Sequence, residues 1–303
     1  MTKSPPMRQA CRYQPDGIYL MSHPDPAPLS STPPPMHGGW SGLCDAWGAT
    51  GAADPDALTP QVLLICEHAS NATAPPWTHF DEDPAQMAAH VASDPGALGL
   101  ARALGAILGQ STGAAELVHA PLSRLIYDLN RSPDRADAMP PVSESFHIRQ
   151  NQGLDLGQRM TRMEALYLPF HNHVRARIAR ALMHGTRPCI VTIHSFSPTW
   201  HGLPRDVEFG IIHDDAPEFA QAILAHSADT GLTTRLNEPY SATDHVTHTL
   251  RLHALPYFLP NAMLELRNDL IASPAQQADI AARLAPAILR AMQTLKDGPC
   301  PQS

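Results

Sequence analysis

From residue 61 onward, short apolar runs of strand length alternate with longer stretches in which apolar residues recur every three or four positions. The first pattern predicts buried β-strands, and the second predicts helices with one face on a core. The longest amphipathic stretch, 154–183, carries Met163, Leu166 and Phe170 at helical spacing. The predicted strands are 62–68, 116–119, 189–193, 207–212 and 262–265, and the predicted helices are 97–109, 154–183, 216–228 and 274–296.

This alternation favours an α/β fold, a three-layer α/β/α sandwich around a mixed, mostly parallel sheet. Residues 1–60 differ, because six prolines fall between positions 24 and 35 among Gly, Ser and Ala residues. Proline fixes φ and lacks a backbone donor, so such a stretch is a poor strand or helix former. We therefore predict a Pro-rich, irregular N-terminal arm at 1–60 and a single domain at 61–303.

Composition narrows the classes of partner. The hydrophobic fraction of 43% allows a sizeable core, and the net charge of -8 argues against a nucleic-acid or anionic-membrane partner. No segment approaches the ~20 apolar residues of a membrane-spanning helix, and the N-terminus lacks a secretory apolar stretch. Five scattered cysteines without a C-x-x-C pair are typical of a reduced chain. We expect a cytoplasmic protein, and its oligomeric state stays open.

Three motifs follow predicted strands: CEHASN at 66–71, TIHSFSP at 192–198 and LELRND at 264–269. In an open α/β sheet, ligands bind outside the carboxyl ends of the strands. His68, His194 and Glu265 should therefore meet at one edge of the sheet. Zinc in hydrolytic sites takes three ligands from His, Asp or Glu and keeps one position open. We predict His68 and His194 as two ligands of zinc or of another divalent ion.

The third ligand stays open at this point. Asp94 precedes the helix predicted at 97–109, which places it close to the first strand. An ordinary helix N-cap, with Pro95 at the first helical position, explains the same pattern equally well. Glu67 competes, although adjacent residues on a strand point to opposite faces. Asn71 also competes, although a neutral amide oxygen is a poor zinc ligand.

Glu265 is the predicted general base. It follows an apolar run, and buried carboxylates are rare unless they are paired or functional. A carboxylate beside a zinc ion can take the proton of an activated water and pass it to a leaving nitrogen. The alternative is a structural salt bridge between Glu265 and an arginine.

Two arginines flank the segment SRLIYDLNR at 123–131. The planar guanidinium suits two-point recognition of a carboxylate, so Arg124 and Arg131 are candidates for a substrate clamp. Arg124 could instead polarise the scissile carbonyl, and Arg131 could be an exposed loop charge. Arg267 fits either a binding or a structural role.

With DLNR at 128–131 added, these motifs resemble the N-formylglutamate amidohydrolase family and, more distantly, zinc carboxypeptidases and N-acyl-amino-acid deacylases. The resemblance implies a zinc-carboxypeptidase-like, phosphorylase/hydrolase-like fold and hydrolysis of N-formyl-L-glutamate to formate and L-glutamate, a step of histidine breakdown. Asn130-Arg131 is similar to the carboxypeptidase pair that binds a terminal carboxylate, and His171 lies in a segment similar to a pocket-lining one. Asn71 and Ser195, within the first two motifs, are further substrate-binding candidates.

One loop, 144–151, departs from the family. Relatives often carry Ile-Pro-Gly-Asn where this chain has Ile-Arg-Gln-Asn at 148–151. Because loops carry specificity, the acyl group or the amino acid could differ. The alternatives are a deacylase or carboxypeptidase-like hydrolase of another small amide, and a small-molecule-binding relative without catalysis.

Overall fold

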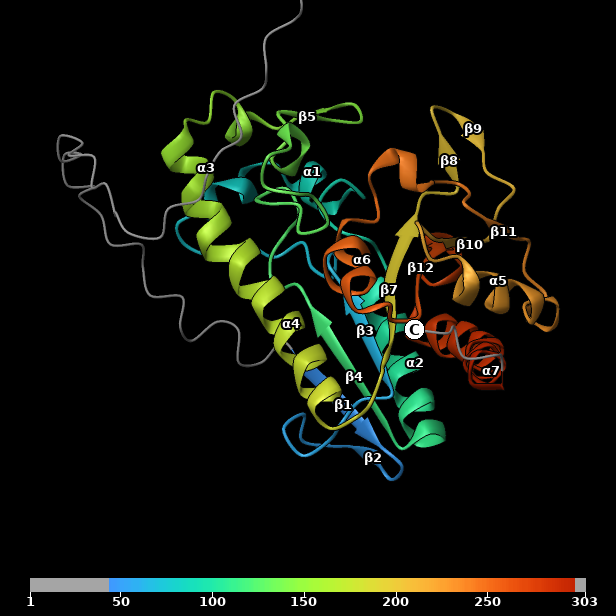
Figure 1. Cartoon of the computed structure of the whole chain (residues 1–303). Coiled ribbons are helices and arrows are strands. Elements are labelled where there is room, and N and C mark those ends of the chain that lie inside the picture. The colour runs from blue at the N-terminus through green and yellow to red at the C-terminus, as the bar shows by residue number, and fades with distance from the viewer. Residues whose placement is uncertain (1–43, 298–303) are drawn as a thin grey trace, which may run out of the picture. The chain divides into compact units, whose positions relative to one another are not determined.

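A mixed sheet of eight strands forms the centre of the computed structural model, which describes residues 44–297 (Figure 1). The strand order is β11-β10-β12-β7-β3-β4-β1-β2. The strands are β1 (Cys44–Gly48), β2 (Gly51–Ala52), β3 (Val62–Cys66), β4 (Ala114–His119), β7 (Cys189–Phe196), β10 (Phe209–Ile212), β11 (Thr234–Leu236) and β12 (Asn261–Arg267). Two hairpins lie outside this sheet, β5 (Val142–Ser143) with β6 (Phe146–His147) and β8 (Thr199–Trp200) with β9 (Leu203–Pro204).

The four central strands, β12, β7, β3 and β4, run parallel to one another. Their carboxyl ends therefore lie at one edge of the sheet. The register pairs Glu265 of β12 with His194 of β7 at that edge. The sheet is mixed, because β1 runs antiparallel to β4 and β2, and β10 runs antiparallel to β12 but parallel to β11.

Helices cover both faces of the sheet. α2 (Ala97–Thr112), α5 (Glu218–Ala225) and α7 (Pro274–Asp297) pack on one face, and α4 (Leu168–Met183) and α6 (His248–His253) pack on the other. Leu63 and Ile65 point toward α4, while Val62 and Leu64 point toward α2, as strand alternation requires. Because these strands are buried on both faces, their sequences are continuous runs of apolar residues. The predicted α/β/α sandwich is confirmed.

Within residues 44–297, no helix combines the length and the apolarity that crossing a membrane demands. The remaining α-helices of the described residues are α1 (Pro84–Ala88) and α3 (Leu156–Arg162).

Several boundaries differ from the sequence pattern. The helix predicted at 154–183 begins at Leu156, where Asp155 and Gln158 form a reciprocal capping box. A π-helical turn, Met163–Tyr167, then separates α3 from α4. Pro169 follows that turn and cannot donate a backbone hydrogen bond, so the regular helical ladder is interrupted there.

Two other elements are shorter than predicted. The strand predicted at 207–212 begins at Phe209, and the helix predicted at 216–228 spans Glu218–Ala225 after Pro217. The N-terminal pattern also differs in part, because residues 44–52 form strands that extend the sheet beside β4 instead of an irregular arm. The rest of the predicted arm, residues 1–43, lies outside the described residues.

Glu116 is a buried carboxylate on β4 that lies away from the carboxyl-end edge. Its Oε2 atom is 3.7 Å from Nε of Arg177, and neither carboxylate oxygen accepts a hydrogen bond. Burial raises the pKa of Glu116 to about 7, although Arg177 opposes the shift. Because the ordinary value is 4.5, the folded chain holds an extra proton between these pH values. Its contribution to stability therefore falls as the pH rises through this window.

We expect Glu116→Gln to raise the free energy of unfolding by roughly 2 kcal/mol at pH 8 and to change it little at pH 5. The neutral amide removes the ionisation that burial opposes. Urea denaturation at both pH values measures the difference. An equal effect at pH 5 and pH 8 would show that packing, not charge, decides the outcome.

Candidate active site

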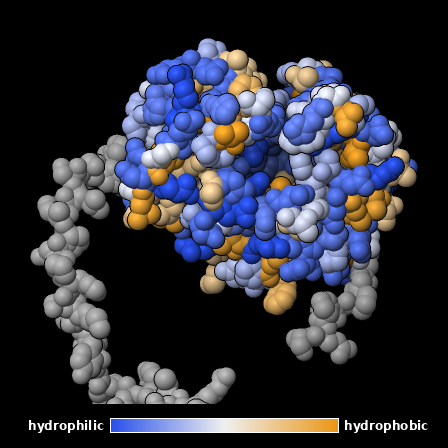
Figure 2. Space-filling view, turned by 90° about the horizontal axis from the view of Figure 1, so that it is seen from above, coloured by the Kyte–Doolittle hydropathy of each residue, from blue (hydrophilic) through white to orange (hydrophobic). Residues whose placement is uncertain are grey.

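A cavity of about 340 Å³ lies at the carboxyl-end edge of the central strands. Figure 2 shows a hollow among hydrophilic residues on the face seen from above. Its lining comes from segments far apart in the sequence, which the parallel strands bring together. The lining residues are His68, His90, Val91, Asp94, Arg124, Leu125, Asp128, Asn130, Arg131, Asp137, Pro140, Val142, Ser143, Glu144, His194, Ser195, Trp200, Tyr240, Val246, Met263 and Glu265.

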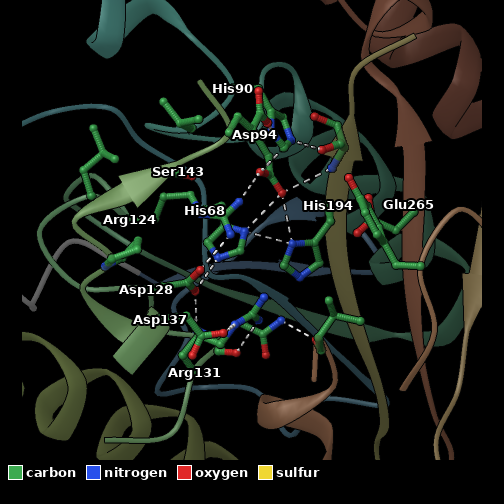
Figure 3. Close-up of a pocket in the computed structure, with 18 of the residues that line it drawn as sticks. His68, His90, Asp94, Arg124, Asp128, Arg131, Asp137, Ser143, His194 and Glu265 are labelled. Atoms are coloured by element: carbon green, nitrogen blue, oxygen red, sulfur yellow. Dashed lines mark hydrogen bonds and ion pairs between the residues drawn. The ribbon is translucent and has the colours of Figure 1, made fainter. Parts of the chain in front are cut away.

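His68, Asp94 and His194 converge in this cavity (Figure 3). Nδ1 of His194 lies 3.2 Å from Nδ1 of His68 and 3.0 Å from Oδ2 of Asp94, and Nδ1 of His68 lies 3.2 Å from that same oxygen. Ligands of a tetrahedral ion at 2.0–2.1 Å are about 3.3 Å apart. The triangle therefore has the dimensions of three ligands around one small ion.

Carboxylates fix the orientation of both imidazoles. Nε2 of His68 lies 2.7 Å from Oδ1 of Asp128, and Nε2 of His194 lies 3.1 Å from Oε2 of Glu67. When Nε2 of His68 carries the proton, it donates to Asp128 and leaves Nδ1 of His68 available to a cation. The two Nδ1 atoms and the Asp94 carboxylate face one another, and either imidazole protons or a cation between them satisfies this arrangement.

The electrostatics of the cluster favour a cation in the same way. Burial opposes ionisation of Glu67, but His194 outweighs it and lowers the pKa of Glu67 to about 2. Burial also opposes protonation of His194, yet Glu67 and Asp94 raise the pKa of His194 well above its usual value. Two nitrogen ligands and one carboxylate, each with its own orienting partner, fit a divalent ion such as zinc.

The local chain path, not helix capping, explains where Asp94 lies. The N-cap of α2 is Gly96, at φ 80°, and no side chain caps this helix. A Cβ at Gly96 would lie 2.3 Å from the carbonyl oxygen of Ile271, so glycine is required there. The N-cap interpretation of Asp94, with Pro95 at the first helical position, is wrong. The backbone N–H of Asp94 instead donates to the carbonyl of His68 at 2.9 Å, which holds Asp94 beside that ligand.

The two competitors for the third ligand lie elsewhere. Glu67 is behind His194, on its Nε2 side, and not in the triangle of donor atoms. Asn71 is exposed, donates its amide to the carbonyl of Met87 at 2.9 Å, and does not line the cavity. The geometry therefore favours Asp94 as a ligand and gives Asn71 no contact with the cavity.

Glu265 lies next to His194 across the β12–β7 pairing, on the same face of the sheet (Figure 3). Only 3% of Glu265 is exposed, and its Oε2 has no hydrogen-bond partner. Within residues 44–297 no Lys or Arg forms an ion pair with it, which contradicts a structural salt bridge. Burial raises the pKa of Glu265 to about 7, although His194 opposes the shift. A carboxylate with that pKa is suited to accept and return a proton near neutral pH.

Gly210 makes room beside this carboxylate. It pairs with Glu265 across β10 and β12, and a Cβ at Gly210 would lie 2.2 Å from the carbonyl oxygen of Glu238 and 3.2 Å from Cβ of Glu265. A larger residue at position 210 would therefore push against the chain that positions Glu265.

Arg124 lines the cavity but is already engaged by carboxylates. Its Nη2 donates to Oδ2 of Asp128 at 2.7 Å, and its Nη1 donates to Oδ1 of Asp94 at 3.3 Å. Burial would raise the pKa of Asp128, but Arg124 and His68 outweigh it and keep that pKa well below its usual value. Arg124 thus holds in place both Asp94 and the carboxylate that orients His68.

Arg131 also lines the cavity, and 13% of its side chain is exposed. Its Nε donates to Asp137 at 3.1 Å, and its Nη1 donates to the carbonyls of Asn130 and His245. The exposed-loop interpretation of Arg131 therefore does not describe its surroundings. The Asn130 side chain accepts from the backbone N–H of Thr249 at 3.1 Å and donates to the carbonyl of Val246.

The other predicted substrate-binding residues divide into two groups. Ser195 lines the cavity, where its N–H donates to Asp94 at 3.3 Å and its hydroxyl donates to the carbonyl of Pro95. Arg267 lies outside the lining and pairs with Asp269 and Glu208. His171 is buried outside the lining as well, so the structure separates it from the cavity.

Among the acidic residues and histidines that line the cavity, four were not predicted as site residues: His90, Asp128, Asp137 and Glu144. Asp128 stands among apolar residues in SRLIYDLNR, and such a buried charge is a usable signal. His90, Asp137 and Glu144 reach the cavity from loops and a hairpin turn, which leave no periodic pattern in the sequence.

His171 belongs to a buried histidine cluster under α4 and α6. Its Nε2 donates to the carbonyl of Leu129 at 2.9 Å, so its Nδ1 accepts from Nε2 of His253 at 2.8 Å. Burial lowers the pKa of His171 to about 3 and that of His253 to about 4. The unfolded chain binds these protons near pH 6.5, so the stability from the neutral pair is present above pH 6.5 and is lost as the pH falls.

We expect His253→Gln to flatten this acid dependence. The glutamine amide can still donate to His171 but does not titrate. Between pH 6.5 and pH 4, the free energy of unfolding should decrease more steeply with falling pH in the parent than in the variant. The difference in slope should correspond to about one bound proton. Chemical denaturation across that range measures both curves. Parallel curves for parent and variant would exclude His253 as a source of acid sensitivity.

Comparisons with known proteins agree with this fold. The family model for N-formylglutamate amidohydrolase matches residues 60–272. The crystal structure of gene product Atu2144 from Agrobacterium tumefaciens is 41% identical, with a TM-score of 0.76 over 84% of this chain and 96% of that one. No curated protein matches the chain.

The fold is also shared with a more distant protein. The N-formylglutamate amidohydrolase from Ralstonia eutropha JMP134 is 15% identical, with a TM-score of 0.59 over 80% of this chain and 96% of that one. The family match covers most of the domain described above, including the two histidines, Asp94 and Glu265. The resemblance predicted from the motifs is confirmed, and the chain belongs to the N-formylglutamate amidohydrolase family.

Proposed function

We propose that this chain hydrolyses the amide bond of a small N-acyl amino acid, with a divalent metal ion held by His68, Asp94 and His194. The observation that carries the proposal is the convergence of these three donor atoms beside the buried, unpaired carboxylate of Glu265. Membership of an amidohydrolase family supports the same reaction class. Zinc is the first metal to test, because imidazole and carboxylate ligands with an open position are typical of hydrolytic zinc sites.

A divalent ion bound at this position supplies a Lewis acid that lowers the pKa of water. Glu265 takes a proton from the attacking water as its oxygen bonds to the carbonyl carbon. The same carboxyl group then returns the proton to the nitrogen as the C–N bond breaks, so that a carboxylic acid and a free amino acid result. The guanidinium of Arg124 lines the cavity and provides positive charge for the developing oxyanion.

A cavity of about 340 Å³ is suited to a small amino-acid derivative. Arg131 is placed to bind the α-carboxylate, because its Nη2 atom makes none of the contacts that its Nε and Nη1 atoms make. N-Formyl-L-glutamate is the reference substrate, since the family is named for it. Its hydrolysis would yield formate and L-glutamate.

The test combines metal analysis of the purified protein with a screen of N-acyl amino acids for release of the free amine. Chelation should abolish amine release, and addition of zinc should restore it. The screen should include N-formyl, N-acetyl and larger acyl groups on the same amino acid. Full activity in metal-free protein, or no amine release from any substrate at full metal occupancy, would contradict the proposal.

A further inference from the structure

The cavity lining is acidic. Five carboxylate residues face two arginines, Arg124 and Arg131. The carboxylates are Asp94, Asp128, Asp137, Glu144 and Glu265. With His90 neutral, a divalent ion at the triangle of donor atoms and the two guanidinium groups would leave one of the five carboxylate charges uncompensated.

Neither arginine is free of a carboxylate. Arg124 donates to Asp128 at 2.7 Å and to Asp94 at 3.3 Å, and Arg131 donates to Asp137 at 3.1 Å. Among residues 44–297, the lining therefore offers no guanidinium that is free of a carboxylate to a substrate with two carboxylates. Arg131 retains one available edge, which is enough for the α-carboxylate that all N-acyl amino acids carry.

Glu144 is a cavity carboxylate whose ion-pair partner is a histidine and not an arginine. It lies in the turn of the β5–β6 hairpin at φ 51°, a left-handed conformation that non-glycine residues rarely adopt. Its ion-pair partner is Nδ1 of His90 at 3.6 Å, and 34% of its side chain is exposed. Glu144 thus lines the cavity from a hairpin outside the central sheet.

A nearby cation, Arg205, lies outside the lining. Its guanidinium lies over the rings of Phe196, Trp200 and Tyr240, with centroid distances of 5.4, 4.9 and 5.1 Å. Arg205 is not among the lining residues, and these three rings hold it in place. The hydrogen bond with His90, and beyond it the charges of Arg124 and Arg205, lower the pKa of Glu144 against burial, so this carboxylate is ionised.

We infer that Glu144 makes this site select N-acyl amino acids with an uncharged or cationic side chain and discriminate against a second carboxylate. The inference rests on the proposed function, since it concerns the substrate of the same site. A side-chain carboxylate would enter a lining that already has excess negative charge and would meet Glu144 there. An amide or ammonium group in the same place would instead donate to Glu144.

The experiment compares N-formyl-L-glutamine with N-formyl-L-glutamate on the metal-loaded full-length protein. The two substrates have nearly the same shape and differ by one charge. We expect kcat/KM to be about tenfold higher for the glutamine derivative at low ionic strength, the effect of one like charge a few ångströms away in a screened pocket. N-Formyl-L-lysine should be cleaved at least as well as the glutamine derivative.

Glu144→Gln should reduce the preference for glutamine over glutamate by about tenfold. Glu218→Gln is the matched control, because Glu218 is an exposed carboxylate on α5 and does not line the cavity. The control should keep the parent's ratio of the two kcat/KM values. An unchanged ratio in Glu144→Gln would overturn the assignment to Glu144.

Kinetic measurements on the parent protein alone also test the inference. Equal or faster cleavage of N-formyl-L-glutamate would overturn it and leave the proposed function intact. If no N-formyl amino acid is cleaved, the proposed function fails, and calorimetric titration with L-glutamine and L-glutamate tests the charge preference separately. Tighter binding of L-glutamine would support the inference, and tighter binding of L-glutamate would overturn it.

Discussion

We expect Glu265→Gln to lower kcat for amide hydrolysis by roughly 10²–10⁴-fold while the metal content stays at the parent level. The substitution keeps the size of the side chain but removes its ability to accept a proton. Glu265 is buried beside His194, lines the cavity and has an unpaired oxygen that can accept a proton there. Steady-state kinetics with metal analysis of the same sample measure the effect.

Glu116→Gln is the matched control for this experiment. Glu116 is also a buried glutamate of the central sheet with raised pKa, but it does not line the cavity. The control should retain the parent's kcat, whereas Glu265→Gln should not. Near-normal turnover in Glu265→Gln would show that Glu265 is structural.

The second large effect concerns the metal. His68→Ala and His194→Ala should each abolish stoichiometric metal binding and, with it, measurable hydrolysis. Each imidazole supplies one of the three donor atoms that converge within residues 44–297, and alanine supplies none. The fold should persist, because both side chains lie at the end of the sheet and outside the main apolar clusters. Plasma mass spectrometry of the dialysed protein measures the metal, and far-ultraviolet circular dichroism checks the fold.

Graded variants separate the ligands from the residues that orient them. Asp94→Asn should lose stoichiometric metal as well, whereas Glu67→Gln and Asp128→Asn should weaken affinity roughly 10–100-fold. His184→Ala, an exposed histidine after α4, is the control and should leave the metal unchanged. Full metal occupancy in Asp94→Asn would return the third ligand to Glu67 or to a residue outside this triangle.

The sequence by itself determined the fold class and the edge at which the site forms. Strands buried on both faces must be continuous apolar runs, so β3, β7 and β12 were visible as such. Polar residues at the carboxyl ends of parallel strands lie at one edge of the sheet. The sequence therefore predicted that His68, His194 and Glu265 lie close together, as the strand pairing shows. These positions depend on local pattern and on a general rule of sheet topology.

Only the tertiary structure decided which residues complete the site. In the sequence, a ligand and a helix cap were equally good interpretations of Asp94, because both follow from an aspartate before a helix. The left-handed Gly96 and the hydrogen bond from the Asp94 N–H to His68 settle its place. Likewise, the sequence predicted that Arg124 is free to bind a substrate carboxylate. In the fold, its guanidinium donates to Asp128 and Asp94 instead.

His171 and Glu144 also show that the sequence does not determine which residues reach the cavity. His171 matches a family segment in sequence, yet its helix turns it into a buried histidine cluster outside the cavity. Glu144 carries no signal in sequence, yet a hairpin turn at positive φ brings it to the cavity. Side-chain direction and contacts between distant loops depend on how the helices and hairpins pack on the sheet. Residue type and spacing along one chain do not contain that information.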